Sequence, residues 1–301
     1  MHKILITGAT GVVGKAIKNY PEYELIMVSS REANLTDLSE TRKLLAVTKP
    51  DSIIHLAALS GGRQLSIQRP ADMLTQNTLM AHNLITSAKD TGIERVGLAL
   101  SGACYGKSAS RLANEFELHN SPIVEEDYAY AYAKRYLEVM MRAFNSQFGM
   151  KIYCFVINGV IGLQMNYSPD KALMVPSLIN KVYQAKKNNE IVNVWGDGSP
   201  QRQYTWDQDI VRNIFWCHSN QMESTVLNIG TNEIVTVAEC AHYICDYFKL
   251  DSAKLFFDLS KGNGKSAQLT DNSSFASLTK FEFQKFSMSI EYVCNNFMSQ
   301  I

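Results

Sequence analysis

The stretch Lys3-Ile-Leu-Ile-Thr7-Gly8-Ala-Thr-Gly11-Val-Val-Gly14 decides the fold expected for this chain. Its apolar first half has the length of a buried strand, and the pattern from Val12 to Tyr20 predicts a helix. The first glycine permits a tight turn, the second lets the backbone approach a pyrophosphate, and the third lets the helix pack closely on the sheet. This order predicts a dinucleotide-binding βαβ unit. The residues predicted to bind the cofactor here are Gly8, Thr10, Gly11, Val12 and Gly14.

The end of the second predicted strand, Glu24–Val28, indicates which dinucleotide binds. An NAD enzyme usually places an acidic residue there for the ribose hydroxyls, whereas this chain continues with Ser29-Ser30-Arg31. Arg31 can form charge-assisted hydrogen bonds to a 2′-phosphate, and the two serines can add neutral ones. The alternative is that Arg31 is a solvated surface residue. Its position after the second strand favours NADP over NAD, with Ser29, Ser30 and Arg31 as contacts.

Further strands and helices alternate along the chain and extend this pattern. A third strand, Ser52–Leu56, ends in the small residues Ala57 and Ala58, so we expect Leu56, Ala57 and Ala58 to lie beside the cofactor. A long amphipathic helix over Ala71–Lys89 carries Asn77, and another strand, Arg95–Leu100, ends at Ser101. The alternation predicts an α/β chain built on a Rossmann-type doubly wound parallel sheet.

Three residues in this pattern have the chemistry of a reductase. Ser101 follows a parallel strand at its carboxyl end, where ligands bind, and Tyr130 and Lys134 lie four apart on one helical face. A lysine ammonium beside a tyrosine is expected to lower the phenol pKa from its usual value of about 10. Tyr130 could then protonate a carbonyl oxygen to which Ser101 is hydrogen-bonded, with a nicotinamide ring as hydride donor. A tyrosine and a lysine at this spacing are otherwise two exposed helix residues.

Composition narrows the class of protein. The 301 residues, 46% of them hydrophobic, can fill one large core or two smaller ones, and we expect two lobes. Equal numbers of basic and acidic residues, 29 each, give no net charge for binding nucleic acid or an anionic membrane. The sequence shows neither a bilayer-spanning run nor a cleavable signal pattern, so a cytoplasmic protein is expected. Six scattered cysteines are expected to be reduced, and no metal site is expected.

Taken together, the glycine turn, Ser101 and the Tyr130–Lys134 pair resemble the extended short-chain dehydrogenase/reductase family. Closer likeness points to its GDP-L-fucose synthase branch, whose members are NADPH-dependent epimerase–reductases acting on GDP-4-keto-6-deoxymannose. The stretches that carry this closer likeness are Val28–Asp37, Ile54–Ala58 with Gly61-Gly62, Tyr132–Arg135 and Val194–Gln203. The resemblance runs through nearly the whole chain.

The resemblance implies roles for individual residues. Ser101, Tyr130 and Lys134 would form the catalytic triad, braced by Asn77, and Tyr130 and Lys134 would also contact the cofactor. The residues implied to lie along the GDP-sugar are Asn166, Val175, Trp195 and Arg202. The expected division is an NADP-binding domain over 1–160 and a mainly substrate-binding α/β lobe over 161–301, with part of 191–230 returning to the first domain. Related enzymes pair their long helices across a homodimer, so a homodimer is expected.

The chain differs from that branch at the two positions that hold the branch's epimerase residues. The cysteine position holds Ala103, with Cys104 displaced by one residue, and the histidine position before Pro176 holds Leu173. Alanine and leucine cannot exchange protons at carbon, and a one-residue slip in an extended segment turns a side chain to the other face. We therefore interpret Cys104 as a buried apolar residue. Two further departures, Gly159 and Gln268, concern the sugar-binding positions.

These observations predict an NADPH-dependent 4-keto reductase of a GDP-4-keto sugar, a 6-deoxyhexose or a heptose, that lacks 3,5-epimerase activity. One alternative is a bifunctional epimerase–reductase in which Cys104 and another base have taken over the epimerase step. A second is a non-catalytic NADP-binding protein of the same fold. The GDP moiety rests on the resemblance alone.

Overall fold

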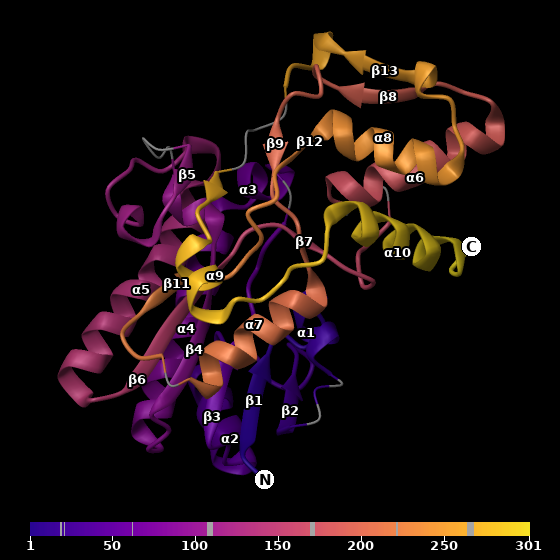
Figure 1. The fold of residues 1–301 in the computed structure, drawn as a ribbon. Coiled ribbons are helices and arrows are strands. Elements are labelled where there is room, and N and C mark those ends of the chain that lie inside the picture. Colours follow the sequence, from indigo (N-terminus) through magenta and orange to yellow (C-terminus); the bar gives the residue numbers. More distant parts are fainter. Residues whose placement is uncertain are drawn as a thin grey trace.

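A six-stranded parallel sheet forms the centre of the structure (Figure 1). The computed structural model describes residues 1–18, 20, 22–61, 63–106, 111–168, 172–220, 222–263 and 268–301. The strands of the sheet, in the order β11-β6-β4-β3-β1-β2, are β11 (Val226–Asn228), β6 (Lys151–Ile157), β4 (Arg95–Ser101), β3 (Ser52–His55), β1 (Lys3–Thr7) and β2 (Glu24–Val28). The order reverses direction between β1 and β3, which makes the carboxyl ends of these two strands the expected ligand crevice.

Helices cover both faces of the sheet, which confirms the predicted doubly wound fold. On one face lie α2 (Leu38–Thr48), α4 (Pro70–Asp90) and α5 (Tyr128–Phe148), and on the other lie α1 (Val12–Ile17) and α7 (Asp207–Ser219). Because side chains alternate along a strand, Leu5 of β1 packs in the first layer, whereas Ile4 and Ile6 pack in the second. Helix α1 ends three residues before the predicted Tyr20.

Local signals in the sequence fix the ends of these helices. The Asp37 side chain accepts a hydrogen bond from the Glu40 backbone N–H, so it caps the start of α2. Pro70 occupies the first turn of α4, where its missing N–H has no helical partner to lose. Helix α5 ends at Gly149, whose φ of 64° is in the left-handed region. Helices α4 and α5, which begin and end at these signals, are long and pack against each other.

A second hydrophobic core lies beyond the sheet. It is formed by α6 (Met174–Asn188), α8 (Val237–Phe248) and α10 (Phe286–Met298), with the parallel pair β8 (Val192–Trp195) and β13 (Leu255–Asp258). In β8, Val192 and Val194 are buried and the alternate residues are exposed, so one face of this pair packs on the helices. Figure 1 shows this group beyond one end of the large sheet.

Short strand pairs and single turns complete the described chain. The pairs are β5 (Leu112–Ala113) with β14 (Leu269–Thr270), β7 (Val160–Ile161) with β10 (Thr205–Trp206), and β9 (Gln201–Arg202) with β12 (Val235–Thr236). The remaining helices are α3 (Arg63–Gln68) and α9 (Ser273–Thr279), and the 3-10 turns are η1 (Gly102–Tyr105), η2 (Glu115–Glu117), η3 (Glu125–Asp127), η4 (Ser252–Lys254) and η5 (Leu259–Lys261). Residues after 160 contribute to both hydrophobic cores, because β11, α7 and α9 pack with the large sheet, whereas α6, α8 and α10 form the second core.

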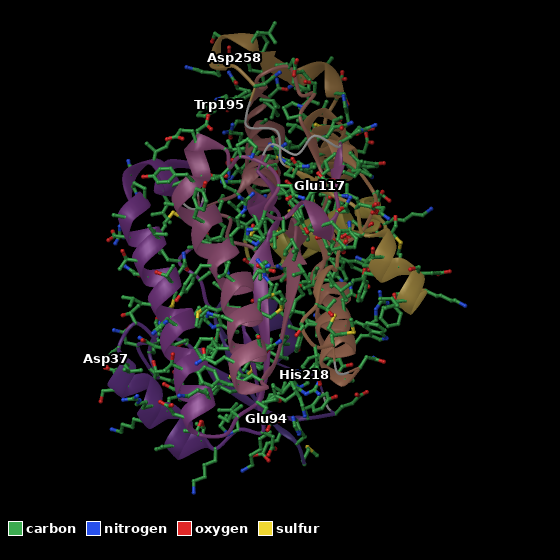
Figure 2. The ribbon with its side chains drawn as sticks, turned by 90° about the vertical axis from the view of Figure 1, so that its left-hand side faces the viewer. Asp37, Glu94, Glu117, Trp195, His218 and Asp258 are labelled. Carbon is green, nitrogen blue, oxygen red and sulfur yellow. The ribbon has the colours of Figure 1, made fainter. Side chains whose placement is uncertain are left out.

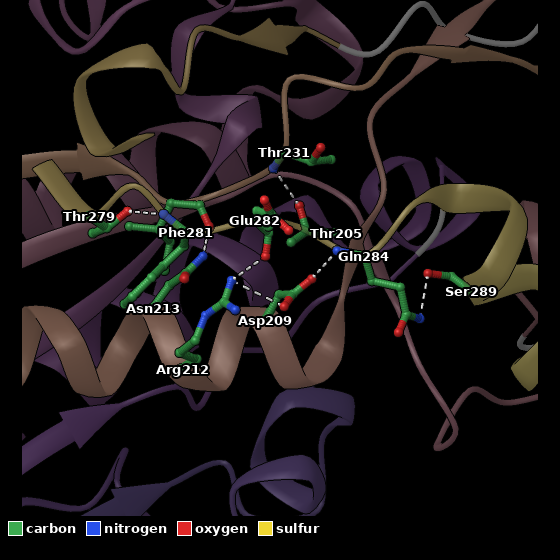
Figure 3. Close-up of polar contacts among 11 residues, drawn as sticks. Thr205, Asp209, Arg212, Asn213, Thr231, Thr279, Phe281, Glu282, Gln284 and Ser289 are labelled. Atoms are coloured by element: carbon green, nitrogen blue, oxygen red, sulfur yellow. Dashed lines mark hydrogen bonds and ion pairs between the residues drawn. The ribbon is translucent and has the colours of Figure 1, made fainter. Parts of the chain in front are cut away.

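The segment that leads from α9 to α10 runs along α7 and joins the two cores (Figure 3). Asp209 of α7 accepts a hydrogen bond from the Gln284 backbone N–H at 2.8 Å and forms an ion pair with Arg212. The Arg212 guanidinium lies 4.3 Å from the centroid of the Phe281 ring. These contacts fix the linker against a helix that itself packs on the sheet.

Candidate active site

The glycine turn after β1 is packed tightly against the end of β3. Gly8 has a φ of 76°, and a Cβ there would lie 2.7 Å from the Ala57 backbone nitrogen. A Cβ on Gly14 would lie 2.3 Å from the Gly8 carbonyl oxygen, so α1 can approach the turn only with glycine at that position. Thr10 and Gly11 are exposed at the tip, and Val12 is half-buried. The turn thus has the backbone conformation and close packing that a pyrophosphate-binding turn requires.

The end of β2 differs from the sequence expectation in one respect. Ser30 and Arg31 are exposed, as a phosphate contact would need, but Ser29 is buried and already has a partner. Its hydroxyl and its backbone N–H both donate to the Glu32 carboxylate, at 2.5 and 2.7 Å. These hydrogen bonds lower the pKa of Glu32. Ser29 therefore orders this turn through Glu32 in the structure.

Asn77 holds the loop that follows β3. Its side-chain oxygen accepts a hydrogen bond from the Leu59 backbone N–H at 2.8 Å, and its amide donates to the carbonyls of Leu59 and Met73. Leu56, Ala57 and Ala58, which precede Leu59, are half-buried. The buried asparagine thus braces the loop at the carboxyl end of β3.

Ser101, Tyr130 and Lys134 converge at the carboxyl end of β4. Ser101 ends the strand and caps η1, accepting a hydrogen bond from the Ala103 backbone N–H at 3.3 Å, and its hydroxyl is close enough to Tyr130 to oppose the rise of the phenol pKa. Lys134 is buried, donates to the Ala99 carbonyl at 2.7 Å, and places its Nζ 5.9 Å from the centroid of the Tyr130 ring. The structure therefore brings together the three residues that the sequence predicts to be catalytic.

The electrostatics of this trio differ from the sequence expectation. Burial raises the pKa of Tyr130 above its usual value, and the Ser101 hydroxyl opposes that rise only in part. The pKa of Lys134 is lowered to about 8, because burial disfavours its charged form. The predicted lowering of the tyrosine pKa by the lysine is therefore not seen in the structure. Lys134 instead has a pKa near neutrality, where it can gain and lose a proton readily.

A buried histidine, which the sequence expectation did not include, lies near the trio. His55 ends β3, and its Nδ1 is 2.8 Å from the Thr7 hydroxyl, which also accepts a hydrogen bond from the Ala57 N–H. Because a hydroxyl can donate one hydrogen bond and accept two, this contact fits either tautomer of the imidazole. Burial, together with the charge of Lys134, lowers the pKa of His55 to about 3. The signal that could have found it is a polar residue inside the apolar run Ser52–Leu56.

The positions that bear on epimerisation face different surroundings. Ala103 is half-buried, whereas Cys104 is fully buried in the core beneath α5, as the sequence analysis predicts. Burial raises the pKa of the Cys104 thiol to about 11. Leu173 is 57% exposed at the start of α6. Neither Ala103 nor Leu173 has a group that titrates, and the Cys104 thiol is protonated and enclosed.

The four predicted substrate residues are less uniform. Trp195 is 65% exposed at the end of β8 with the Lys181 ammonium over its ring, and Figure 2 shows it beside Asp258 at the far end of the molecule from Glu94 and His218. Asn166 is exposed and accepts a hydrogen bond from the Ser168 N–H. Arg202 is half-buried on β9 and donates to the Gln201 carbonyl. Val175 is different. Its side chain is 1% exposed and packs in the second core, so only its backbone could meet a ligand.

The segment at Gly159 packs against, and is hydrogen-bonded to, other segments of the chain. A Cβ on Gly159 would lie 1.9 Å from the Gln203 carbonyl oxygen, which explains why only glycine fits. The amide of the neighbouring Asn158 donates to the Gln203 side chain and to the Gln268 carbonyl. Gln203 is buried and also accepts from the Thr270 N–H at 2.8 Å. Gln203 was not predicted as a site residue, and this network is where three distant segments meet.

Comparison with known proteins assigns the chain to a family. A family model described as the NAD dependent epimerase/dehydratase family matches residues 4–230. The chain belongs to this family. The match spans β1 to β11, and hence the whole large sheet, the glycine turn and the Ser101, Tyr130 and Lys134 trio.

Relatives within the epimerase/dehydratase family confirm the resemblance drawn from the motifs. A probable GDP-L-fucose synthase of Drosophila melanogaster is 30% identical over 293 residues, covering 92% of this chain and 91% of that protein. A GDP-L-colitose synthase of Yersinia pseudotuberculosis is 29% identical, covering 99% and 98%. The crystal structure of a GDP-L-fucose synthetase from Naegleria fowleri bound to NADP has a TM-score of 0.90 at 24% identity, covering 99% of this chain and 93% of that one.

No group of three or more histidine, cysteine, aspartate or glutamate side chains within the described ranges is arranged to hold a metal ion. In the same ranges, no helix combines the length and the apolar character that crossing a membrane requires.

Proposed function

We propose that this chain is an NADPH-dependent reductase of the 4-keto group of a GDP-linked sugar, in nucleotide-sugar biosynthesis, and that it does not epimerise C3 or C5. The observation that carries the proposal is a reductase trio assembled at the carboxyl end of β4, in a chain whose two expected epimerase positions hold residues that cannot act as bases. Ser101, Tyr130 and Lys134 meet there, whereas Ala103 and Leu173 carry no titratable group. The predicted division into a cofactor-binding and a substrate-binding domain is part of this proposal.

The residues of the cofactor region fit a dinucleotide. The turn from Gly8 to Gly14 leaves its tip exposed while its base is too tightly packed for any side chain. Arg31 is exposed after β2, where a 2′-phosphate would be met by a guanidinium. NADP is supported further by the relatives, one of which has been crystallised with it. Bound NADPH supplies a hydride to the carbonyl carbon of the substrate.

The chain's own residues handle the proton that accompanies the hydride. A keto oxygen held between Ser101 and Tyr130 can accept a hydrogen bond from both hydroxyls as negative charge develops on it. The high pKa of Tyr130 keeps its phenol protonated at neutral pH, so it can donate that proton to the oxygen as the alcohol forms. The phenolate left behind is stabilised by the Lys134 ammonium, whose Nζ lies beside the ring. Lys134, with a pKa of about 8, can return a proton to the phenolate and regain one from water.

The sugar nucleotide is proposed from the second core and from the relatives' names. Trp195 is exposed and can stack on a base, and Arg202 of β9 carries a guanidinium suited to diphosphate oxygens. The Drosophila and Yersinia relatives are named for GDP-sugars. The second candidate, a bifunctional epimerase–reductase, is favoured by those same names. Against it stands Cys104, which is enclosed and protonated.

The proposed activity is tested by NADPH oxidation with GDP-4-keto-6-deoxymannose. We expect turnover by the wild-type chain. Because Tyr130→Phe removes the proton donor, we expect it to lower kcat by about 10²- to 10⁴-fold while NADPH binding, followed by fluorescence, stays unchanged. Tyr136→Phe on the same helix is the matched control, since the Tyr136 hydroxyl is hydrogen-bonded to His82 of α4 and its ring packs against the core. Tight NADPH binding without turnover of any 4-keto nucleotide sugar would contradict the proposal and favour a non-catalytic protein.

A further inference from the structure

Arg135 follows Lys134 on α5 but its side chain is directed to the turn after Ser101. It is 7% exposed, and its guanidinium donates from Nε to the Cys104 carbonyl and from Nη2 to the Ser121 carbonyl, both at 2.7 Å. The Ser121 hydroxyl in turn donates to the Tyr105 carbonyl. One guanidinium therefore joins η1, the segment at Ser121 and the helix that carries Tyr130.

The same turn is held from its other end. Gly106 has a φ of 64°, and a Cβ there would lie 2.3 Å from the Pro122 carbonyl oxygen, so the chain after η1 packs directly on the segment that Arg135 binds. Both carbonyls bound by Arg135 thus belong to backbone that has little freedom to shift. The fork of the guanidinium matches two acceptors at fixed positions, which a lysine ammonium cannot do.

Arg135 is also unusual for a buried cation. Burial lowers its pKa, and no carboxylate forms an ion pair with it among the residues that the structure describes. By contrast Arg142, two turns further along α5, pairs with Glu138 at 2.8 Å. An unpaired buried charge is costly, and an apolar side chain of similar size would pack without that cost. What the arginine provides is directional hydrogen bonding to the turn.

We propose that Arg135 is a positioning residue that sets the Ser101 hydroxyl relative to Tyr130. The inference rests on the proposed reductase function. Ser101 is the cap of η1, and its hydroxyl is close enough to Tyr130 to influence the phenol, so a shift of the turn moves the Ser101 oxygen relative to the phenol. Arg135 itself touches neither the phenol nor the lysine through any hydrogen bond in the described chain.

The proposal predicts a particular kinetic signature for Arg135→Met. A small misplacement of a reacting group costs up to about 100-fold, so we expect kcat to fall about 10- to 100-fold with the KM for NADPH and NADPH binding unchanged. The alkaline limb of the kcat profile is expected to report the Lys134 ammonium, whose pKa is about 8 and with which Arg135 forms no hydrogen bond in the described chain. That limb should therefore keep its position while kcat falls. Arg135→Lys keeps the charge but not the fixed pair of N–H donors, so we expect it to lower kcat nearly as much as Arg135→Met does.

A double-mutant cycle with Ser101→Ala decides between positioning and general stability. If Arg135 acts through Ser101, Arg135→Met has little further effect on kcat in the Ser101→Ala background. Equal losses in both backgrounds, or a full kcat in Arg135→Lys and Arg135→Met, would overturn the proposal. Arg142→Met, with the same change on the same helix, should leave kcat unchanged. Absence of turnover by the wild-type chain would instead overturn the proposed function, and this inference with it.

Discussion

At the scale of single residues, burial determines the protonation states of the candidate active site, because it disfavours the charged forms of both Tyr130 and Lys134. The convergence of these two residues with Ser101 follows from a strand end and one helical face, both of which can be predicted from residue spacing. The state of Tyr130 could not be predicted in the same way, because its pKa depends on burial that only the folded packing creates. The enclosure of Val175 has the same origin in tertiary packing, whereas Ser29 is bound within its own turn by Glu32, three residues later.

A prediction at this scale concerns His218, which is buried against Tyr153 and Ser52. Burial lowers its pKa to about 3 from an unfolded value of 6.5. Between these two pH values the His218 imidazole is protonated in the unfolded chain and neutral in the folded chain. The free energy of unfolding therefore falls as pH falls below 6.5, by about 1.4 kcal/mol per pH unit. His55 acts in the same direction, and Asp207, whose pKa is raised to about 6, acts in the opposite direction below that pH.

His218→Asn should therefore flatten the dependence of unfolding free energy on pH between 6.5 and 5, measured by urea unfolding. The variant is expected to be less stable than wild type at pH 7, because two side-chain hydrogen bonds lose their partner, so the slope is the quantity to compare. His242→Asn, at an exposed position, should leave the slope as it is. A slope for His218→Asn equal to that of wild type would contradict the role of His218.

At the scale of elements, long regular segments are predictable and short pairings are not. The strands β1 to β4 and the helices α4 and α5 follow from apolar spacing and caps. Strand β6 was not predicted, although the continuous apolar run after Gly149 is a signal that could have found it. The two-residue strands β9 and β12 carry no such signal, because they exist only where the chain crosses between the cores.

We propose a homodimer, as the family resemblance implies, with the outward faces of α4 and α5 as its interface. Leu79 of α4 and Tyr132 and Val139 of α5 are exposed apolar side chains on two helices that already pack together. Val139→Lys should place an uncompensated charge in the interface and shift the protein toward monomer in sedimentation velocity. Val47→Lys on α2, at a position 73% exposed, is the matched control and should stay dimeric. A monomeric wild-type chain would contradict the dimer.

At the scale of the whole molecule, the site lies where two cores meet. Gly102 of η1 packs directly on Asn158, whose side-chain amide donates to Gln203, next to β9. The chain's return to the sheet through α7 and β11 was expected within 191–230, whereas the later return through α9 was not. It could not be predicted because Phe275, which anchors α9, sits in a short segment with little periodicity.

The central claim, reduction at C4 without epimerisation, is tested most directly by turnover of GDP-4-keto-6-deoxymannose with NADPH in deuterated water, the product being read by NMR and mass spectrometry. We predict an alcohol at C4 with no carbon-bound deuterium at C3 or C5, because Ala103 and Leu173 cannot exchange protons and Cys104 is enclosed. Deuterium at C3 or C5 of the reduced product would contradict the account and identify an epimerase–reductase whose base remains to be located around Cys104.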